Sequence, residues 1–317
     1  MFHQAQMRGV LHVALLLSFI SLPHLSHARE GGGIKGKIME NIIQKKIKAK
    51  KDEEKDHGSA EGLYTKGHGH SATQSIGDRT FIVYTPASYK TQKNLPLLIV
   101  LHGGFGNAAQ IKNYIGLDPL ADKHNFIVAY LDGTQVARKL SDKFKGWNVG
   151  DCCGQPQTND IDDVGFIGHV IDVMNEKYGI DKSNVYGTGH SNGAMMTQRV
   201  ICETNLYKDA ITLSGTLQMN LETCPHAKGS RIMNIHGAQD ANLPVAGGHT
   251  TAGINKKTDY KSQEHTKEVF QKSGVNYELL LLDGADHSPK TLNEVLINKY
   301  GMTLPEKIVD YLGLDKN

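Results

Sequence analysis

The sequence places a serine between glycines in a pattern that is typical of a nucleophile. Residues 189–193 read Gly-His-Ser-Asn-Gly, which matches the Gly-x-Ser-x-Gly signature of a sharp strand-to-helix turn. The glycines keep such a turn free of clashes while its strained backbone holds the serine at the apex. A β-rich run at 184–188 precedes the motif, and a helix-like run at 194–203 follows it. Ser191 is therefore the candidate nucleophile.

A serine hydroxyl is a weak nucleophile, so a base must accept its proton. In proteins with this turn, the acid and then the histidine follow the serine along the chain. Asp240 comes shortly after the apolar run 232–235, and His287 comes shortly after the run 277–282. Both positions are loops that follow strands. We therefore expect His287 to act as the base and Asp240 to orient it.

Four other residues compete for these two roles. His190 and His236 adjoin glycine turns at strand ends, where packing or turn hydrogen bonds explain them better than base catalysis does. Asp283 and Asp286 are alternatives for the acid. Asp286 is the direct chain neighbour of the candidate base, which makes the required side-chain geometry awkward.

A glycine-rich segment supplies the third part of the chemistry. Residues 102–106 read His-Gly-Gly-Phe-Gly and follow the continuous apolar run 97–101. Such a loop presents backbone N–H groups to the negative oxygen that develops on a carbonyl substrate. We assign the two donors to the backbone N–H groups of Gly104 and Asn192. Phe105 is the alternative to Gly104, because the register of this loop is open by one residue.

Strand-like and helix-like segments alternate from about residue 62 to the end of the chain. The strand-like runs are 80–85, 97–101, 126–131, 184–188, 210–213, 232–235 and 277–282, and the helix-like stretches are 108–124, 164–177, 194–203, 262–273 and 304–312. Continuously apolar runs are typical of strands buried on both faces. The alternation predicts an α/β protein with a mostly parallel sheet flanked by helices on both faces. Together with the nucleophile turn, this is the α/β-hydrolase fold.

The charge balance excludes one class of partner. Lys and Arg number 35 against 33 for Asp and Glu, so no excess of positive charge points to nucleic acid. An alternative from a different class, a non-catalytic secreted binding protein on a hydrolase scaffold, would use the lysine-rich segment near the N-terminus as its contact surface. The presence of suitable residues for all three catalytic roles disfavours this alternative.

The N-terminal segment predicts export. Residues 1–28 combine Arg8, a short apolar run and small residues before an expected cleavage after Ala28, which is the pattern of a signal peptide. The apolar run is too short and too interrupted for stable membrane insertion. Residues 29–61 predict a charged flexible leader, and residues 62–317 predict the catalytic domain. We expect a secreted or periplasmic protein.

An exported protein can keep disulfides, and four cysteines allow three pairings. Cys202 lies about 16 Å along the predicted helix that follows Ser191, which places it near the opposite edge of the sheet. Cys224 precedes a strand and is expected near that same edge. We therefore predict a Cys202–Cys224 disulfide. Cys152 and Cys153 then lie near the catalytic edge, either as a vicinal disulfide or as free thiols.

Several stretches resemble the feruloyl esterase and poly(3-hydroxybutyrate) depolymerase-like hydrolases, the group that also holds acetylxylan-type carbohydrate esterases. The matching stretches are LPLLIVLHGGFGNA, WNVGDCCG, DIDDVGFI, GHSNGAMMTQRV and IHGAQDANLPVAGG. The resemblance implies an extracellular carboxylic-ester hydrolase that needs no metal or organic cofactor. It implies feruloyl or acetyl esters of polysaccharides as substrates, with oligomers or polymers of 3-hydroxybutyrate as the alternative.

Three residues are candidates for the substrate pocket, namely Phe105, Trp147 and His190. Trp147 lies on a long connection that follows a predicted strand, and such loops gather at the C-terminal edge of a parallel sheet. Packing in the core explains Trp147 equally well. Asp162 and Asp163 open a predicted helix, where N-capping is a simpler explanation than contact with substrate.

Overall fold

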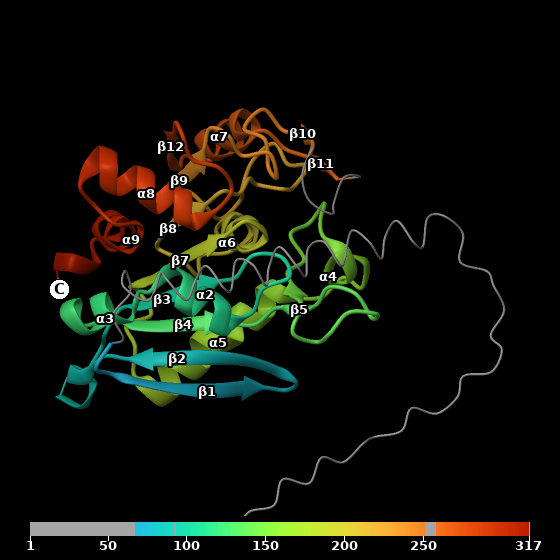
Figure 1. Ribbon diagram of the computed structural model, residues 1–317. Helices are drawn as coiled ribbons and strands as arrows, with labels where there is room; N and C mark the ends of the chain where they lie inside the picture. The colour runs from blue at the N-terminus through green and yellow to red at the C-terminus, as the bar shows by residue number, and fades with distance from the viewer. Residues whose placement is uncertain (1–66, 92, 251–257, 317) are drawn as a thin grey trace, which may run out of the picture. The chain divides into compact units, whose positions relative to one another are not determined.

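The computed structural model describes residues 67–91, 93–250 and 258–316, so the predicted signal peptide and charged leader lie outside the described residues. The described chain is built around an eight-stranded sheet in the order β1-β2-β4-β3-β7-β8-β9-β12 (Figure 1). Its strands are β1 (His70–Ile76), β2 (Arg79–Thr85), β3 (Leu97–Leu101), β4 (Ile127–Leu131), β7 (Val185–His190), β8 (Asp209–Leu213), β9 (Arg231–Gly237) and β12 (Asn276–Leu282). β1 and β2 pair antiparallel, and the six strands from β4 to β12 are parallel. The predicted α/β-hydrolase fold class is confirmed.

Helices cover both faces of this sheet (Figure 1). They are α2 (Ala108–Ile115), α3 (Asp118–His124), α4 (Gly154–Thr158), α5 (Asp163–Tyr178), α6 (Asn192–Glu203), α7 (Gln263–Lys272), α8 (Pro289–Tyr300) and α9 (Leu304–Leu312). One buried apolar cluster joins the sheet to α5, α6 and α7, and a second joins it to α2, α3, α8 and α9. Every residue of β3 and β4 is buried, as their continuous apolar runs predict. None of the described helices is long and apolar enough to cross a membrane.

The structure corrects the helix predicted over residues 108–124. Gly116 adopts a left-handed conformation with φ of 69° and ends α2, and α3 begins at Asp118 with a proline in its first turn. Among the elements that were not predicted are β1 and α8. β1 is an edge strand rich in polar residues, so it lacks the apolar run of a central strand.

Four connections meet at the C-terminal edge of the sheet because the parallel strands that lead into them point the same way. They follow β3, β7, β9 and β12, and they carry residues 102–106, Ser191, Asp240 and His287. Two short antiparallel strand pairs complete the described elements, β5 (Thr134–Gln135) with β6 (Lys145–Gly146) and β10 (Gly248–His249) with β11 (Asp259–Tyr260). The 3-10 turns are η2 (Ala87–Thr91) and η3 (Leu314–Lys316). Ligand sites of parallel sheets lie at this edge.

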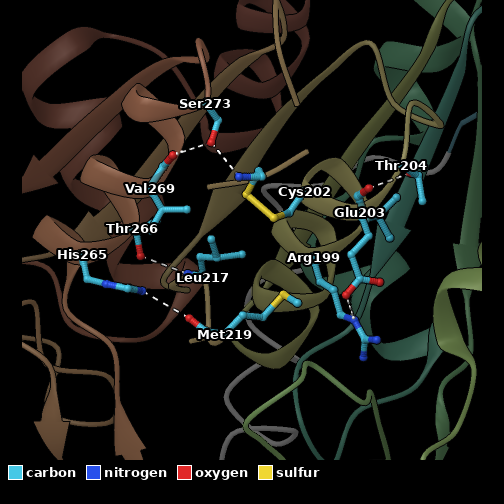
Figure 2. Close-up of a disulfide and its surroundings, with 12 residues drawn as sticks. Arg199, Cys202, Glu203, Thr204, Leu217, Met219, His265, Thr266, Val269 and Ser273 are labelled. Carbon is cyan, nitrogen blue, oxygen red and sulfur yellow. Dashed lines mark hydrogen bonds and ion pairs between the residues drawn. A yellow bond between two sulfur atoms is a disulfide. The ribbon is translucent and has the colours of Figure 1, made fainter. Parts of the chain in front are cut away.

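Cys202 and Cys224 form a disulfide near the last turn of α6 (Figure 2). The Ser273 hydroxyl accepts a hydrogen bond from the backbone N–H of Cys224 at 2.7 Å and donates to the Val269 carbonyl at 2.6 Å. The bridge therefore joins α6 to the end of α7 as well as to the segment before β9. Cys152 and Cys153 form a second, vicinal disulfide.

We expect the Cys202→Ala/Cys224→Ala double variant to lose about 3 kcal/mol of unfolding free energy, because the bridge closes a loop with a sequence separation of 22. Thermal denaturation of the two proteins measures this loss as a fall in Tm of several degrees. A peptide map of the unreduced wild type is the control and should show Cys202 joined to Cys224. A peptide that joins Cys202 to Cys153 would contradict the pairing.

Candidate active site

Ser191 occupies a strained backbone position between β7 and α6. Its φ is 56° and its ψ is −121°, a conformation that L-residues rarely adopt. A Cβ on Gly189 would lie 2.5 Å from the carbonyl oxygen of Gly193, and a Cβ on Gly193 would lie 2.5 Å from that of His102. Only glycine therefore fits on either side of the turn. This turn places Ser191 at the C-terminal end of β7, directly before the first residue of α6.

The structure brings the three predicted residues into one hydrogen-bonded line. The Ser191 hydroxyl lies 2.9 Å from Nε2 of His287, and Nδ1 of His287 lies 2.7 Å from Oδ2 of Asp240. Because the carboxylate can only accept, the imidazole donates from Nδ1 and is free to accept the serine proton at Nε2. The His287 side chain is 16% exposed and that of Asp240 is fully buried. This arrangement suits proton transfer from Ser191 to His287.

Asp240 is held by hydrogen bonds to both of its carboxylate oxygens. Its Oδ1 accepts the backbone N–H groups of Asn242 and Leu243 at 2.9 and 2.8 Å. Its Oδ2 faces His287 and, at 3.2 Å, Nε2 of His236. Burial by itself raises the pKa of Asp240, but the hydrogen bonds from His236, His287 and Leu243 outweigh it and hold the pKa below its usual range. The carboxylate therefore stays ionised beside His287.

The loop after β3 lies against the nucleophile turn. A Cβ built on Gly103 would lie 3.4 Å from Cβ of Ser191, and one built on Gly104 would lie 3.7 Å from Cβ of Asn192. The backbone N–H of Phe105 donates to the carbonyl of Lys145 at 2.7 Å, so it is already engaged. Of the two alternatives in this loop, the geometry thus favours Gly104. Asn192 is the first residue of α6, where backbone N–H groups lack partners within the helix.

Trp147 forms hydrogen bonds with both the loop after β3 and the nucleophile turn. Its side chain is fully buried, its Nε1–H donates to the carbonyl of His102 at 2.9 Å, and its backbone N–H donates to Oδ1 of Asn192 at 2.7 Å. The Asn192 amide also donates to the carbonyl of Trp147 at 3.2 Å. Of the two interpretations of Trp147, its complete burial supports packing in the core over a pocket-lining position. Sequence reasoning missed that Trp147 connects the loop after β3, through its indole, to the nucleophile turn, through its backbone.

His102 is a further residue whose role the motif alone does not reveal. Its Nε2 accepts the backbone N–H of Gly133 at 3.0 Å, so its Nδ1 carries the proton and donates to the carbonyl of Gly103 at 2.8 Å. The ring is 1% exposed and lies 5.0 Å from the Trp147 ring between centroids. His102 therefore holds the carbonyl of the Gly103–Gly104 peptide, the same peptide group that carries the Gly104 N–H.

The two aspartates that open α5 have different roles. Asp162 caps the helix by accepting the backbone N–H of Gly165 at 2.7 Å, as predicted. Asp163 does not cap. It is 1% exposed, accepts the backbone N–H of Asn148 at 2.7 Å and lies 2.7 Å from a guanidinium nitrogen of Arg79. Burial raises the pKa of Asp163, and the charge of Arg79 opposes this.

We expect Arg79→Met to lower the unfolding free energy by about 3–5 kcal/mol, because it leaves a buried carboxylate without its partner. Urea denaturation at neutral pH measures the change. Lys182→Ala is the matched control, since it removes an ion pair with Asp172 whose side chains are 52% and 57% exposed, and such pairs contribute about 0–1 kcal/mol. Equal losses in the two variants would show that burial of the Arg79 pair does not matter.

The alternative residues for the base and the acid make contacts that do not include the Ser191 hydroxyl in the described structure. His190 donates from Nε2 to the carbonyl of His287 at 2.8 Å, and its ring lies 4.9 Å from the His287 ring between centroids, tilted by 50°. Burial, with the neighbouring His287, lowers the pKa of His190 to about 3, so it is neutral and braces the histidine loop. Asp283 and Asp286 are exposed, and Asp286 accepts from Ser288 and Thr291 in its own loop.

Phe105 is the third candidate pocket residue. It is half-buried, and its ring lies 6.4 Å from that of Phe144 between centroids. Within the described ranges, no three His, Cys, Asp or Glu side chains are grouped so as to hold a metal ion.

Comparison with known proteins relates the chain to esterases. A model of the phospholipase/carboxylesterase family matches residues 157–282. Feruloyl esterase B of Piromyces equi is 29% identical over 177 residues, which cover 54% of this chain and 31% of that protein. The bifunctional acetylxylan esterase/xylanase XynS20E of Neocallimastix patriciarum is 25% identical over 233 residues, which cover 67% of this chain and 31% of that protein. The chain thus spans about a third of the length of these relatives.

A solved structure shows the same fold at lower identity. The S-formylglutathione hydrolase from Agrobacterium tumefaciens superposes with a TM-score of 0.56 and 13% identity, covering 78% of this chain and 96% of that one. The predicted resemblance is confirmed by these matches. The chain has the α/β-hydrolase fold and is similar in sequence to esterases of the feruloyl esterase and acetylxylan esterase kind.

Proposed function

We propose that the protein is a secreted serine carboxylic-ester hydrolase that cleaves feruloyl or acetyl esters of polysaccharides. The observation that carries the proposal is the hydrogen-bonded line from Ser191 through His287 to Asp240, at 2.9 and 2.7 Å. Relatives named as feruloyl and acetylxylan esterases support the substrate class. Export rests on the signal-peptide pattern of residues 1–28.

The reaction follows from the placement of these groups. His287 accepts the proton of Ser191 as the hydroxyl oxygen attacks the ester carbonyl, and Asp240 stabilises the imidazolium that forms. His287 then protonates the departing alcohol, which leaves the acyl group on Ser191. Water repeats the sequence and releases the acid.

The negative oxygen of each tetrahedral intermediate would be stabilised by the backbone N–H groups of Gly104 and Asn192. Each such donor contributes about 2.7–4 kcal/mol to transition-state stabilisation. The hydrogen bonds from Trp147 to His102 and Asn192 keep the two donors in register before substrate arrives. Such preorganisation is what makes these donors effective.

A substrate series tests the proposed specificity. We expect the purified protein to hydrolyse both p-nitrophenyl acetate and methyl ferulate. Phe105 lies within the loop after β3, and its half-buried aromatic ring favours contact with an aromatic acyl group. Hydrolysis of acetate without ferulate would restrict the substrates to acetyl or hydroxyalkanoate esters. A kcat/KM that grows with each unit of a 3-hydroxybutyrate oligomer would instead identify a depolymerase.

A further inference from the structure

A buried chain of hydrogen bonds leads from Asp240 into the core, away from Ser191. Its first member is His236, near the end of β9, which is fully buried. Nε2 of His236 lies 2.9 Å from the carbonyl oxygen of Leu243 and 3.2 Å from Oδ2 of Asp240. Both of these oxygens only accept hydrogen bonds, so Nε2 of His236 carries a proton. Asp240 therefore faces a histidine N–H from each side.

The other ring nitrogen of His236 is held as an acceptor by Gln263, the first residue of α7. Nε2 of Gln263 lies 2.9 Å from Nδ1 of His236 and 2.7 Å from the carbonyl of Gly215. Oε1 of Gln263 accepts from the Tyr277 hydroxyl at 2.9 Å and from the Asn234 amide at 2.8 Å. The Gly215 carbonyl requires a donor, which sets the orientation of the Gln263 amide. These contacts make Nε2 of His236 the donor and Nδ1 the acceptor, which defines one tautomer of the ring.

This chain of groups is shielded from solvent along its length. Gln263 is 1% exposed, Tyr277 is 6% exposed, and Asn234 is fully buried. In a buried environment hydrogen bonds are stronger than in water, and a polar group without a partner destabilises the fold. The network joins β9, α7 and β12, so its geometry is set by packing of the core rather than by the loop that carries Asp240.

We propose that His236, fixed by Gln263, is a positioning residue that holds the Asp240 carboxylate and shares its charge with His287. The inference rests on the proposed ester hydrolysis, because it assigns a role within that reaction. With two N–H groups on Oδ2, Asp240 stabilises the His287 imidazolium less strongly than it would with His287 alone. His287 can therefore accept the Ser191 proton and still release it to the leaving alcohol.

The pH profile is the readout that separates this role from a structural one. The titratable groups that bear on His236 and Asp240 are His287 and His190 from the neighbouring loops and Tyr277 behind Gln263. Burial keeps Tyr277 and His190 neutral, with the pKa raised for the first and lowered for the second. Loss of the His236 donor should therefore act through the Asp240–His287 pair.

The experiment compares four variants with wild type in the full protein. His236→Leu removes the donor to Asp240, His236→Gln keeps a donor amide in the ring's place, and Gln263→Leu frees the tautomer of His236. Gln218→Leu is the matched control, since Gln218 is also 1% exposed and also bonds through both amide atoms, but to Asp259 and Lys261. The measurements are kcat/KM for p-nitrophenyl acetate against pH, Tm, and the downfield proton resonance of the His287–Asp240 hydrogen bond.

We expect His236→Leu to lower kcat/KM by about tenfold or more and to move the acidic limb of the profile to higher pH by about half a unit. Gln263→Leu should move the limb in the same direction, and His236→Gln should restore it. Gln218→Leu should lower Tm without moving the limb. If His236→Leu does not fold, the pH profiles of Gln263→Leu and His236→Gln are compared with that of the wild type instead.

Profiles of His236→Leu and Gln263→Leu that overlay the wild type and Gln218→Leu would overturn the inference. A wild type that hydrolyses no ester would reject the proposed function instead. In that event the downfield resonance of the His287–Asp240 hydrogen bond still tests the role of His236, because it can be measured without any catalytic activity. A resonance that shifts in Gln263→Leu and not in Gln218→Leu supports the role of His236, and an unshifted resonance refutes it.

Discussion

Replacing Ser191 with alanine is expected to lower kcat by about 10⁶-fold. The variant lacks the hydroxyl oxygen that we propose as the attacking group, and the hydrogen-bond donors that remain cannot supply a nucleophile. Because alanine carries the same Cβ as serine, it adds no new steric strain at a φ of 56°, and Tm should stay close to that of the wild type. Hydrolysis of p-nitrophenyl acetate and methyl ferulate measures the loss.

Ser214 offers a matched control for this variant. It follows β8, the neighbouring strand, with a φ of 50°, and it is fully buried. Among the described residues, its hydroxyl has no hydrogen-bond partner, so Ser214→Ala should leave kcat within a few-fold of wild type. Activity that survives in Ser191→Ala would contradict the assignment of the nucleophile. Equal losses in both variants would point to disturbance of the turn rather than to lost chemistry.

Asp240→Asn is expected to lower kcat by about 10⁴-fold while the fold is retained. The backbone N–H groups of Asn242 and Leu243 donate to Oδ1, so the amide oxygen of the variant should stay on that side. Its NH₂ group would then face Nδ1 of His287 and Nε2 of His236, the two nitrogens that contact Oδ2 of Asp240. A donor there selects the tautomer of His287 with its proton on Nε2, which cannot accept the proton of Ser191.

A pH series of stability provides the independent check for this variant. The pKa of Asp240 is below its unfolded value, so ionised Asp240 stabilises the fold above the unfolded pKa, about 3.9. That contribution is lost as pH falls through the lower folded pKa. Asp240→Asn should therefore reduce stability at neutral pH and flatten its acid dependence. Near-normal kcat would show that Asp240 does not set the tautomer of His287.

Local sequence rules located the nucleophile turn because its requirements are local. Two glycines, a preceding β-rich run and a following helix are written within residues 184–203, and no distant contact is needed to recognise them. The strand runs were equally readable, since β3 and β4 are buried on both faces and therefore continuously apolar. Boundaries were less accurate where a single glycine, Gly116, divides one helical stretch in two.

Chain order also predicted which loops would meet. Parallel strands share one C-terminal edge, so residues that follow β7, β9 and β12 converge there whatever the lengths of the helices between them. This geometric rule is why Asp240 and His287 could be named from their places after strands. The loop after β3 could be placed by the same rule, but the rule could not decide whether Gly104 or Phe105 supplies the N–H donor. Only the structure distinguishes them, because the N–H of Phe105 already donates to the carbonyl of Lys145.

The sequence by itself therefore determined the fold class, the nucleophile turn and the strand ends that carry the acid and the histidine. Only the tertiary structure decided that Trp147 lies under the loop after β3, that Asp163 pairs with Arg79, and that His236 faces Asp240. The physical reason is that a side chain's partner depends on which strands become neighbours and on how the helices pack. Neither the order of the strands in the sheet nor the packing of the helices can be predicted from periodicity or spacing within one segment.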